Sequence, residues 1–204
     1  MSLFKISDLE SRGSQQRLRD SYSGIYSSES SRIAEAMENF SQFDSNTVYD
    51  IFLSHSYTDK RVILGLLRVL TEDFLYSVYV DWINDQELDR TSVNKDTAEQ
   101  LKYRMQCCKC LFYVTTENAS SSKWMPWETG LMDGLKHRVA ICPLVSDSTD
   151  FYYGQEYLGI YPYVSEAIPE GETDKKLWIN ESSDTYTTFD GWLQGYNPTK
   201  HGSV

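Results

Sequence analysis

The sequence has no long hydrophobic run. Its longest apolar stretch, from Val62 to Leu70, is interrupted by Arg68, and its first ten residues are mixed and polar. A membrane-spanning helix needs about 20 consecutive apolar residues, and a secretory leader needs an apolar segment that this N-terminus lacks. We therefore expect a cytoplasmic protein that has no membrane partner.

Basic residues are also scarce. Lys and Arg number 19 against 30 Asp and Glu, which gives a net charge of −11 over 204 residues. A nucleic-acid-binding surface needs a basic face to contact phosphates, so this balance argues against a nucleic-acid partner. It does not exclude a small phosphate-bearing ligand, because backbone N–H groups can bind phosphates locally.

Cysteine is rare, and its distribution predicts neither a disulfide framework nor a metal site. Three of the four cysteines lie within four residues, and the three histidines are far apart. We expect no bound metal, a reducing cytosolic environment and buried thiols where a helix leads into a strand. The four cysteines are Cys107, Cys108, Cys110 and Cys142.

Glycine-rich nucleotide-binding motifs are missing. No G-x-G-x-x-G, G-K-[ST] or G-x-S-x-G motif follows a predicted strand, and no internal repeat is visible. These absences argue against a Rossmann site, a P-loop and the nucleophile elbow of a hydrolase.

The composition divides the chain in two. Residues 1–46 contain 12 serines and form a Ser-rich extension, whereas residues 47–204 form the main domain, with its core in 47–145. In the extension, apolar residues recur at helical spacing from a cap near Ser30 to Phe40, which predicts one short helix. We expect the extension to pack on the domain or on a partner.

From residue 47 onward, short apolar segments alternate with segments of helical periodicity. This alternation predicts right-handed βαβ units, and therefore an α/β domain with a doubly wound parallel sheet covered by helices on both faces. The pattern weakens after residue 147. The expected strands are 48–53, 78–80, 111–114 and 139–145, with shorter ones at 161–164 and 177–179, and the expected helices are 63–70, 98–108, 124–135 and 186–193.

One segment after the third strand combines an aromatic ring with a carboxylate. Pro126 is tolerated only in the first turn of a helix, which places Glu128 near a helix start. Trp124 and Glu128 are then neighbours on one helix face, beyond the carboxyl ends of the strands, where such sheets bind ligands. They form either a ligand site or an ordinary helix start, in which the carboxylate complements the helix dipole and the indole packs on the sheet.

Three segments resemble motifs of the Toll/interleukin-1 receptor (TIR) domains. Residues 49–56, with Asp59 after them, resemble the opening strand and loop of that family. Residues 124–128 are similar to its S-x-W-C-x-x-E helix start, with Met125 where Cys is common, and residues 80–82 resemble its second strand.

The resemblance covers about Tyr49 to Val145, and it places the family's BB loop at about 83–94. It implies a flavodoxin-like TIR fold with about five parallel strands and an N-terminal helical extension. Among TIR proteins, the chain most resembles the TIR subunits of bacterial Thoeris anti-phage systems. These consume NAD⁺ and release a cyclic or modified ADP-ribose signal that activates an effector protein.

The resemblance assigns the catalytic role to Glu128. Breaking the nicotinamide–ribose bond passes through an oxocarbenium-like state, which a carboxylate stabilises. The nicotinamide departs as a neutral molecule, so the reaction needs no general acid and no cofactor besides NAD⁺ as its substrate. Attack by water gives ADP-ribose, whereas attack by a hydroxyl or by the adenine of the same molecule gives a ring.

Aromatic and polar residues around Glu128 are the expected NAD⁺-binding residues. Trp124 would form a wall beside the ribose or nicotinamide, and Trp82 or Trp127 a second wall, although a core position is the competing interpretation for Trp127.

A further set would hold the rest of the substrate. Ser54 and His55 begin a segment whose N–H groups suit a diphosphate, Phe52 ends the strand beneath them, and Asp81 flanks the same crevice.

Two other functions compete with the enzyme. The first is a non-catalytic TIR adaptor that acts by self-association through the loop at 83–94, and the second is a doubly wound nucleotide-binding or receiver-like domain. The carboxylate at the family's catalytic position, four residues after Trp124, favours the enzyme. The resemblance also implies that enzyme and self-association coexist, because TIR enzymes assemble so that one protomer's BB loop completes its neighbour's site.

Overall fold

The computed structural model describes residues 1–14, 43–80, 95–116, 122, 124–149, 151–152, 154 and 156–202. The helix predicted between Ser30 and Phe40, the site residues Asp81 and Trp82, and the predicted BB loop at 83–94 lie outside the described residues.

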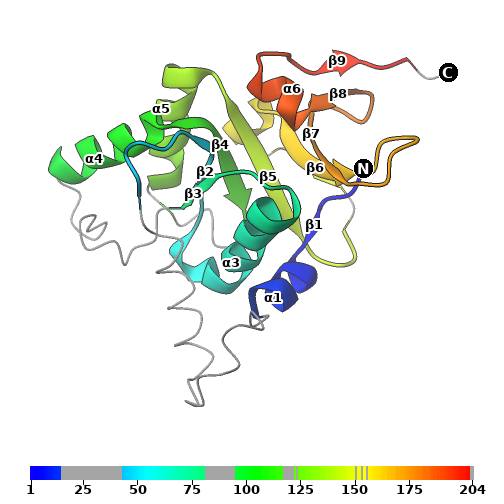
Figure 1. The fold of residues 1–204 in the computed structure, drawn as a ribbon, viewed down its shortest axis with the longest axis horizontal. Coiled ribbons are helices and arrows are strands. Elements are labelled where there is room, and N and C mark those ends of the chain that lie inside the picture. Colours follow the sequence, from blue (N-terminus) through cyan, green and yellow to red (C-terminus); the bar gives the residue numbers. More distant parts are fainter. Residues whose placement is uncertain are drawn as a thin grey trace.

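Five parallel strands form the centre of one large sheet, in the order β3-β2-β4-β5-β6 (Figure 1). The chain enters at β2, moves outward to β3, and crosses back to β4, β5 and β6, which is the doubly wound order of a flavodoxin-like sheet. The predicted α/β class and its five parallel strands are therefore confirmed. The strands are β2 (Tyr49–Ser54), β3 (Val78–Val80), β4 (Cys108–Thr115), β5 (Val139–Val145) and β6 (Tyr163–Ala167).

Beyond β6 the sheet becomes antiparallel. The helix predicted at 186–193 is wrong in its first half, because the β-branched and aromatic residues up to Thr188 form a strand instead. The helix begins only at Phe189, where Thr188 Oγ1 accepts a hydrogen bond from the N–H of Gly191 at 3.2 Å. The elements are β7 (Lys176–Asn180), β8 (Thr185–Thr188), α6 (Phe189–Leu193) and β9 (Thr199–Lys200).

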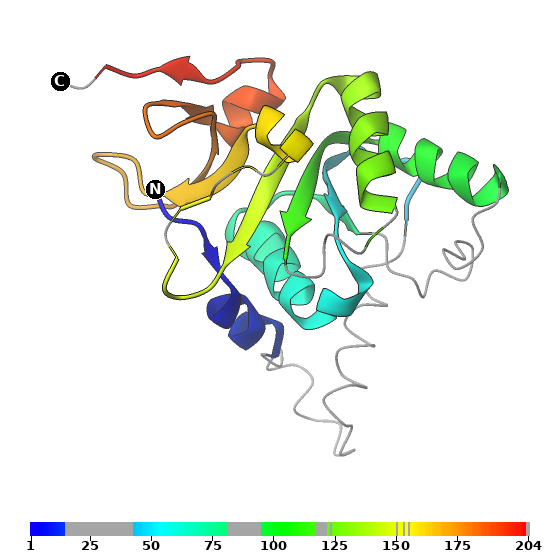
Figure 2. The same ribbon diagram turned by 180° about the vertical axis from the view of Figure 1, so that it is seen from behind.

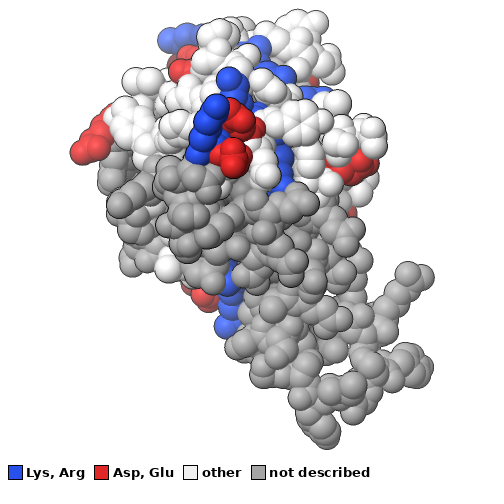
Figure 3. Space-filling model, turned by 90° about the vertical axis from the view of Figure 1, so that its left-hand side faces the viewer, with Lys and Arg blue, Asp and Glu red and all other residues white. Residues whose placement is uncertain are grey.

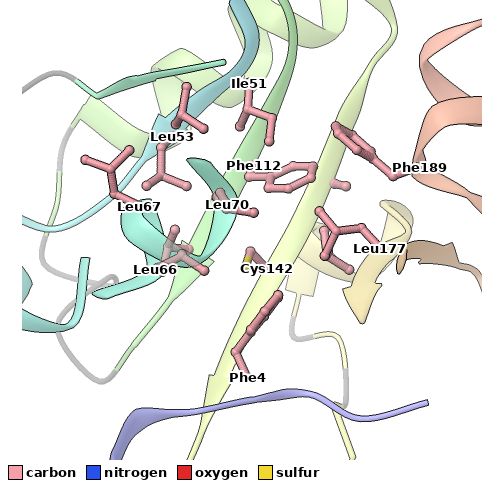
Figure 4. Packing of buried hydrophobic residues seen from close by; sticks show 14 of the residues in the cluster. Phe4, Ile51, Leu53, Leu66, Leu67, Leu70, Phe112, Cys142, Leu177 and Phe189 are labelled. Carbon is pink, nitrogen blue, oxygen red and sulfur yellow. The ribbon is translucent and has the colours of Figure 1, made fainter. Parts of the chain in front are cut away.

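Helices cover both faces of the parallel sheet (Figures 1 and 2). Alternate residues of β2 supply two separate cores: Ile51 and Leu53 pack with α1 and α3, and Phe52 packs with α4 and α5. In the first core, shown in Figure 4, the rings of Phe112 and Phe189 lie 5.0 Å apart. The helices are α1 (Ile6–Ser14), α3 (Lys60–Arg68, continued by a π-helical turn at Val69–Asp73), α4 (Lys95–Gln106), α5 (Trp124–Lys136) and two 3-10 helices at Tyr57–Asp59 and Glu156–Ile160.

The cysteines are free thiols, and one of them corrects a predicted boundary. Cys108 is the first residue of β4 and not the last of a helix, because α4 ends at Gln106. Cys108 packs in the core beneath α4 and α5, whereas Cys110 packs in the opposite core. Burial raises the pKa of the Cys110 and Cys142 thiols. Within the described ranges, no three metal-ligating side chains gather.

Residues 1–14 pack on the domain through a strand and a helix that the sequence analysis did not predict. The two-residue strand β1 (Phe4–Lys5) pairs in parallel with β5, with Phe4 opposite Leu144, and Ser2 forms a bridge with Glu166. Helix α1 follows directly and packs on α3 (Figure 1). The division of the chain at residue 46 stays a prediction.

Glycines allow α1 and α3 to approach backbone to backbone. A Cβ placed on Gly65 of α3 would lie 1.9 Å from the carbonyl oxygen of Leu9, and one on Gly13 of α1 would lie 2.3 Å from that of Arg61. Neither position can hold a larger residue without moving a helix.

Side chains of both charges share the face that carries α4. Figure 3 views this side and shows Lys or Arg next to Asp or Glu in its described part. Lys95 Nζ and Glu99 Oε1, one helical turn apart, are separated by 3.6 Å. Both side chains are mainly exposed, so this ion pair adds little stability. None of the helices in the described ranges is long and apolar enough to cross a membrane.

Replacing Gly65 with alanine should push α1 away from α3. The clashing atom is a backbone carbonyl that cannot rotate aside, so we expect the free energy of unfolding to fall by about 1–3 kcal/mol. Gly134→Ala in the exposed part of α5 is the matched control, because a Cβ there would meet no atom within 4 Å apart from its chain neighbours and the backbone of its own helix. That change should leave stability equal or raise it by up to about 1 kcal/mol. Urea unfolding followed by circular dichroism measures both, and equal stability of the two variants would contradict the packing described above.

Candidate active site

A buried hydrogen bond joins two of the predicted site residues. Ser54 is the last residue of β2, and Glu128 lies in the second turn of α5. The hydroxyl of Ser54 donates to Glu128 Oε2 at 2.5 Å. Both residues are buried, and Glu128 has no exposed surface. The structure thus brings together a serine and a carboxylate that are 74 residues apart in the sequence.

The sheet determines where this pair meets. β2 and β4 are adjacent and parallel, so their carboxyl ends lie side by side, and the chain leaving β4 forms α5 over the same face. Met125 and Met132 of α5 are buried in the core on this face. Because Met125, Glu128 and Met132 are spaced at about one helical turn, anchoring the methionines turns the carboxylate toward the sheet.

The start of α5 agrees with the motif that predicted it. The N–H of Met125 donates to Ser122 Oγ at 3.3 Å, and Thr129 Oγ1 donates to the carbonyl oxygen of Met125 at 2.8 Å. Pro126 is the third residue of the helix, where its missing N–H removes no helical hydrogen bond. The predicted placement of Glu128 near the start of a helix is confirmed.

The two tryptophans of α5 occupy different environments. Trp124 is partly buried against the core beneath α5, one helical turn before Glu128, whereas Trp127 is 39% exposed. Their rings meet edge to face, with centroids 5.5 Å apart. The competing interpretation of Trp127 as a core residue is therefore wrong.

The other described site candidates lie beside Ser54. Phe52 is fully buried, with its ring 5.7 Å from that of Tyr79. His55 is buried as well, and its Nδ1 lies 3.2 Å from the carbonyl oxygen of Leu53. A carbonyl oxygen only accepts, so this contact requires a proton on Nδ1.

A second contact ties the same two loops together. Asp59 precedes α3 but makes no capping hydrogen bond with its side chain. Its Oδ2 instead accepts a hydrogen bond from Thr116 Oγ1, the residue after β4, at 2.5 Å. This bond holds the segment after β2 against the carboxyl end of β4, next to Ser54.

Sequence reasoning missed Tyr113. It is the register partner of Ser54 in the β2–β4 ladder, and it is 3% exposed on the face that α5 covers. Burial raises the pKa of its hydroxyl, and so do Tyr157 and the nearby charge of Glu128. A strand position gives no sign of its cross-strand neighbour, so only knowledge of the register could have identified this residue.

Ser54→Ala should destabilise the protein by leaving a buried carboxylate oxygen without this donor. We expect the free energy of unfolding to fall by about 1–3 kcal/mol. Ser182→Ala is the matched control, because Ser182 also donates to a carboxylate, Asp184 Oδ1 at 2.6 Å, but in a more exposed turn. Its loss should cost less than about 0.5 kcal/mol. Thermal unfolding of both variants tests this. Equal losses of stability would show that the buried hydrogen bond from Ser54 stabilises the protein no more than the exposed one from Ser182.

Comparison with known proteins fits this geometry. No family model matches the chain. Over 200 residues, 95% of the chain and 99% of the relative, it is 46% identical to the "Probable 3' cyclic ADP-D-ribose synthase ThsB'" of Bacillus cereus (strain MSX-D12). Over 130 residues, 59% of the chain but 34% of that protein, it is 32% identical to the "Putative cyclic ADP-D-ribose synthase TIR2" of Cytobacillus dafuensis. The chain belongs to the family of Thoeris TIR-domain proteins.

Proposed function

We propose that this protein is a TIR-domain enzyme that cleaves the nicotinamide–ribose bond of NAD⁺ and makes a cyclic ADP-ribose messenger in anti-phage defence. The observation that carries the proposal is the buried Ser54–Glu128 pair at the carboxyl ends of β2 and β4. The 46% identity to a protein named as a cyclic ADP-D-ribose synthase supports the cyclic product. In enzymatic terms it is an NAD⁺ nucleosidase and ADP-ribosyl cyclase.

The chemistry requires a single carboxylate. As the glycosidic bond breaks, its electron pair moves to the pyridinium nitrogen, and nicotinamide leaves as a neutral molecule. Positive charge develops on the ribose, and the carboxylate of Glu128 stabilises it. The hydrogen bond from Ser54 holds one carboxylate oxygen in place, so that the group is oriented before the substrate arrives.

Neighbouring residues form the remainder of the proposed NAD⁺ site. Trp124 lies against the ribose or nicotinamide and Trp127 closes the outer side, while the segment starting at Ser54 and His55 holds the diphosphate. Phe52 forms the floor of this segment.

Asp81 and Trp82 complete the set that we propose for NAD⁺ binding. The reaction needs no further cofactor.

Access to Glu128 requires movement. A carboxylate with no exposed surface cannot touch a substrate until the groups that cover it shift. We therefore expect low basal activity, raised when copies of the chain associate through the loop at 83–94. In this proposal the enzyme works in the cytoplasm, and its product activates a separate effector protein.

Glu128→Gln tests the proposal directly. The substitution keeps the size of the side chain but removes its charge, so nicotinamide release should fall about 100-fold or more. Glu99→Gln, on the exposed side of α4, is the matched control and should retain the wild-type rate. Incubation of each purified protein with NAD⁺, with the products resolved by mass spectrometry, measures both rates.

Two results would count against this function. Equal nicotinamide release by wild type and Glu128→Gln would show that the carboxylate of Glu128 is not needed for catalysis. No release by the wild type under any activating condition would favour the non-catalytic adaptor instead.

A further inference from the structure

Tyrosines cluster on the sheet next to the catalytic pair. Tyr113 is the register partner of Ser54, and it lies in the core beneath α5 against which Tyr152 also packs. Burial is the main cause of the raised pKa of Tyr113, and Tyr157, Glu128 and Tyr152 add to it. We call Tyr113, Tyr152 and Tyr157 the tyrosine cluster. Its members come from β4 and from the segment that follows β5.

The segment after β5 is fastened to the helix that carries Glu128. Tyr161 donates a hydrogen bond to Asp133 Oδ2 of α5 at 3.2 Å, and the ring of Tyr152 lies 5.9 Å from that of Tyr163. These contacts hold the segment over the sheet at β5 and β6. Tyr157, on the 3-10 helix of this segment, is 43% exposed, so the cluster runs from the buried Tyr113 to the surface.

One hydroxyl of the cluster is buried and unused. Within the described part of the chain, the hydroxyl of Tyr152 has no hydrogen-bond partner and essentially no exposed surface. Leaving such a group unsatisfied costs about 1–3 kcal/mol, which a phenylalanine would avoid at the same size. An aromatic residue that serves only packing does not need this hydroxyl. A ligand with an oxygen or nitrogen acceptor could accept a hydrogen bond from it.

The protonation state of Tyr113 fits binding rather than acid–base chemistry. Burial, Tyr157 and the charge of Glu128 all raise its pKa, so it stays neutral at any physiological pH. A neutral phenol adds a donor and a flat face beside the carboxylate without adding charge. A nucleoside, with its flat base and its ribose hydroxyls, matches both features.

We propose that the tyrosine cluster binds the adenosine part of NAD⁺ beside Glu128, so that ring closure is favoured over attack by water. This inference rests on the proposed function. The bond from the anomeric carbon to nicotinamide breaks, and its electron pair leaves with nicotinamide. A ribose hydroxyl oxygen of the adenosine forms the new bond to that carbon and releases its proton to the carboxylate of Glu128. If water attacks instead, the same carbon acquires a hydroxyl and the product is linear ADP-ribose.

The test measures the ratio of products rather than activity alone. Tyr113→Phe, Tyr152→Phe and Tyr157→Phe each remove one hydroxyl and keep the ring. We expect the ratio of cyclic product to linear ADP-ribose to fall about fivefold or more in the Tyr113 and Tyr152 variants, whatever the change in total nicotinamide release. Tyr186→Phe, in the antiparallel strand β8, is the matched control and should keep the wild-type ratio.

The outcomes separate this inference from the proposed function. A hydroxyl with only a structural role would change both products in proportion, so an unchanged ratio in all three variants overturns the inference. If the wild type makes the cyclic product and the variants keep the same product ratio, the proposed function still holds. If the wild type releases no nicotinamide, both the proposed function and this inference are wrong.

Discussion

A carboxylate without exposed surface is the constraint on which this site depends. Such a group is costly to bury unless a donor compensates for the water that it loses. Glu128 receives a hydrogen bond from Ser54 at 2.5 Å, and this contact requires that the ends of β2 and β4 lie together under α5. The position of the site therefore depends on the register of the sheet. If β2 shifted by one residue, Ser54 would turn to the face of α1 and α3, and Glu128 would lose the hydrogen bond from Ser54.

The two cores hold this register from both sides. Leu53 packs beneath α3, and Phe52, one residue earlier, packs beneath α4 and α5. Strands buried on both faces have a continuous apolar sequence, and a slip moves residues of different size into both cores at once. Ser54 is the polar residue at the end of this apolar run, which is why it can serve the site without weakening the strand.

Local signals in the sequence were sufficient for the parts of the molecule that depend on nearby residues. The alternation of apolar segments identified the parallel strands, and Pro126 located the start of α5 and therefore Glu128. The sequence carries no such signal for contacts between residues that are far apart along the chain. The two-residue strand β1 carries no periodicity, and its pairing with β5 spans about 140 residues. Tyr113 looks like any aromatic strand residue until the β2–β4 register places it beside Ser54.

The surroundings of Glu128 explain how a single carboxylate can suit ring formation. Hydrolysis and cyclisation share the same bond cleavage and differ only in the nucleophile, so the outcome depends on what stands next to the anomeric carbon. Bulk water is abundant, and an intramolecular hydroxyl competes with it only when the site is closed and the substrate is held in a bent form. Here the carboxylate is fully buried, and its described neighbours include the serine that orients it and a tyrosine of raised pKa. Burial of this carboxylate away from bulk water favours closure of a ring over hydrolysis.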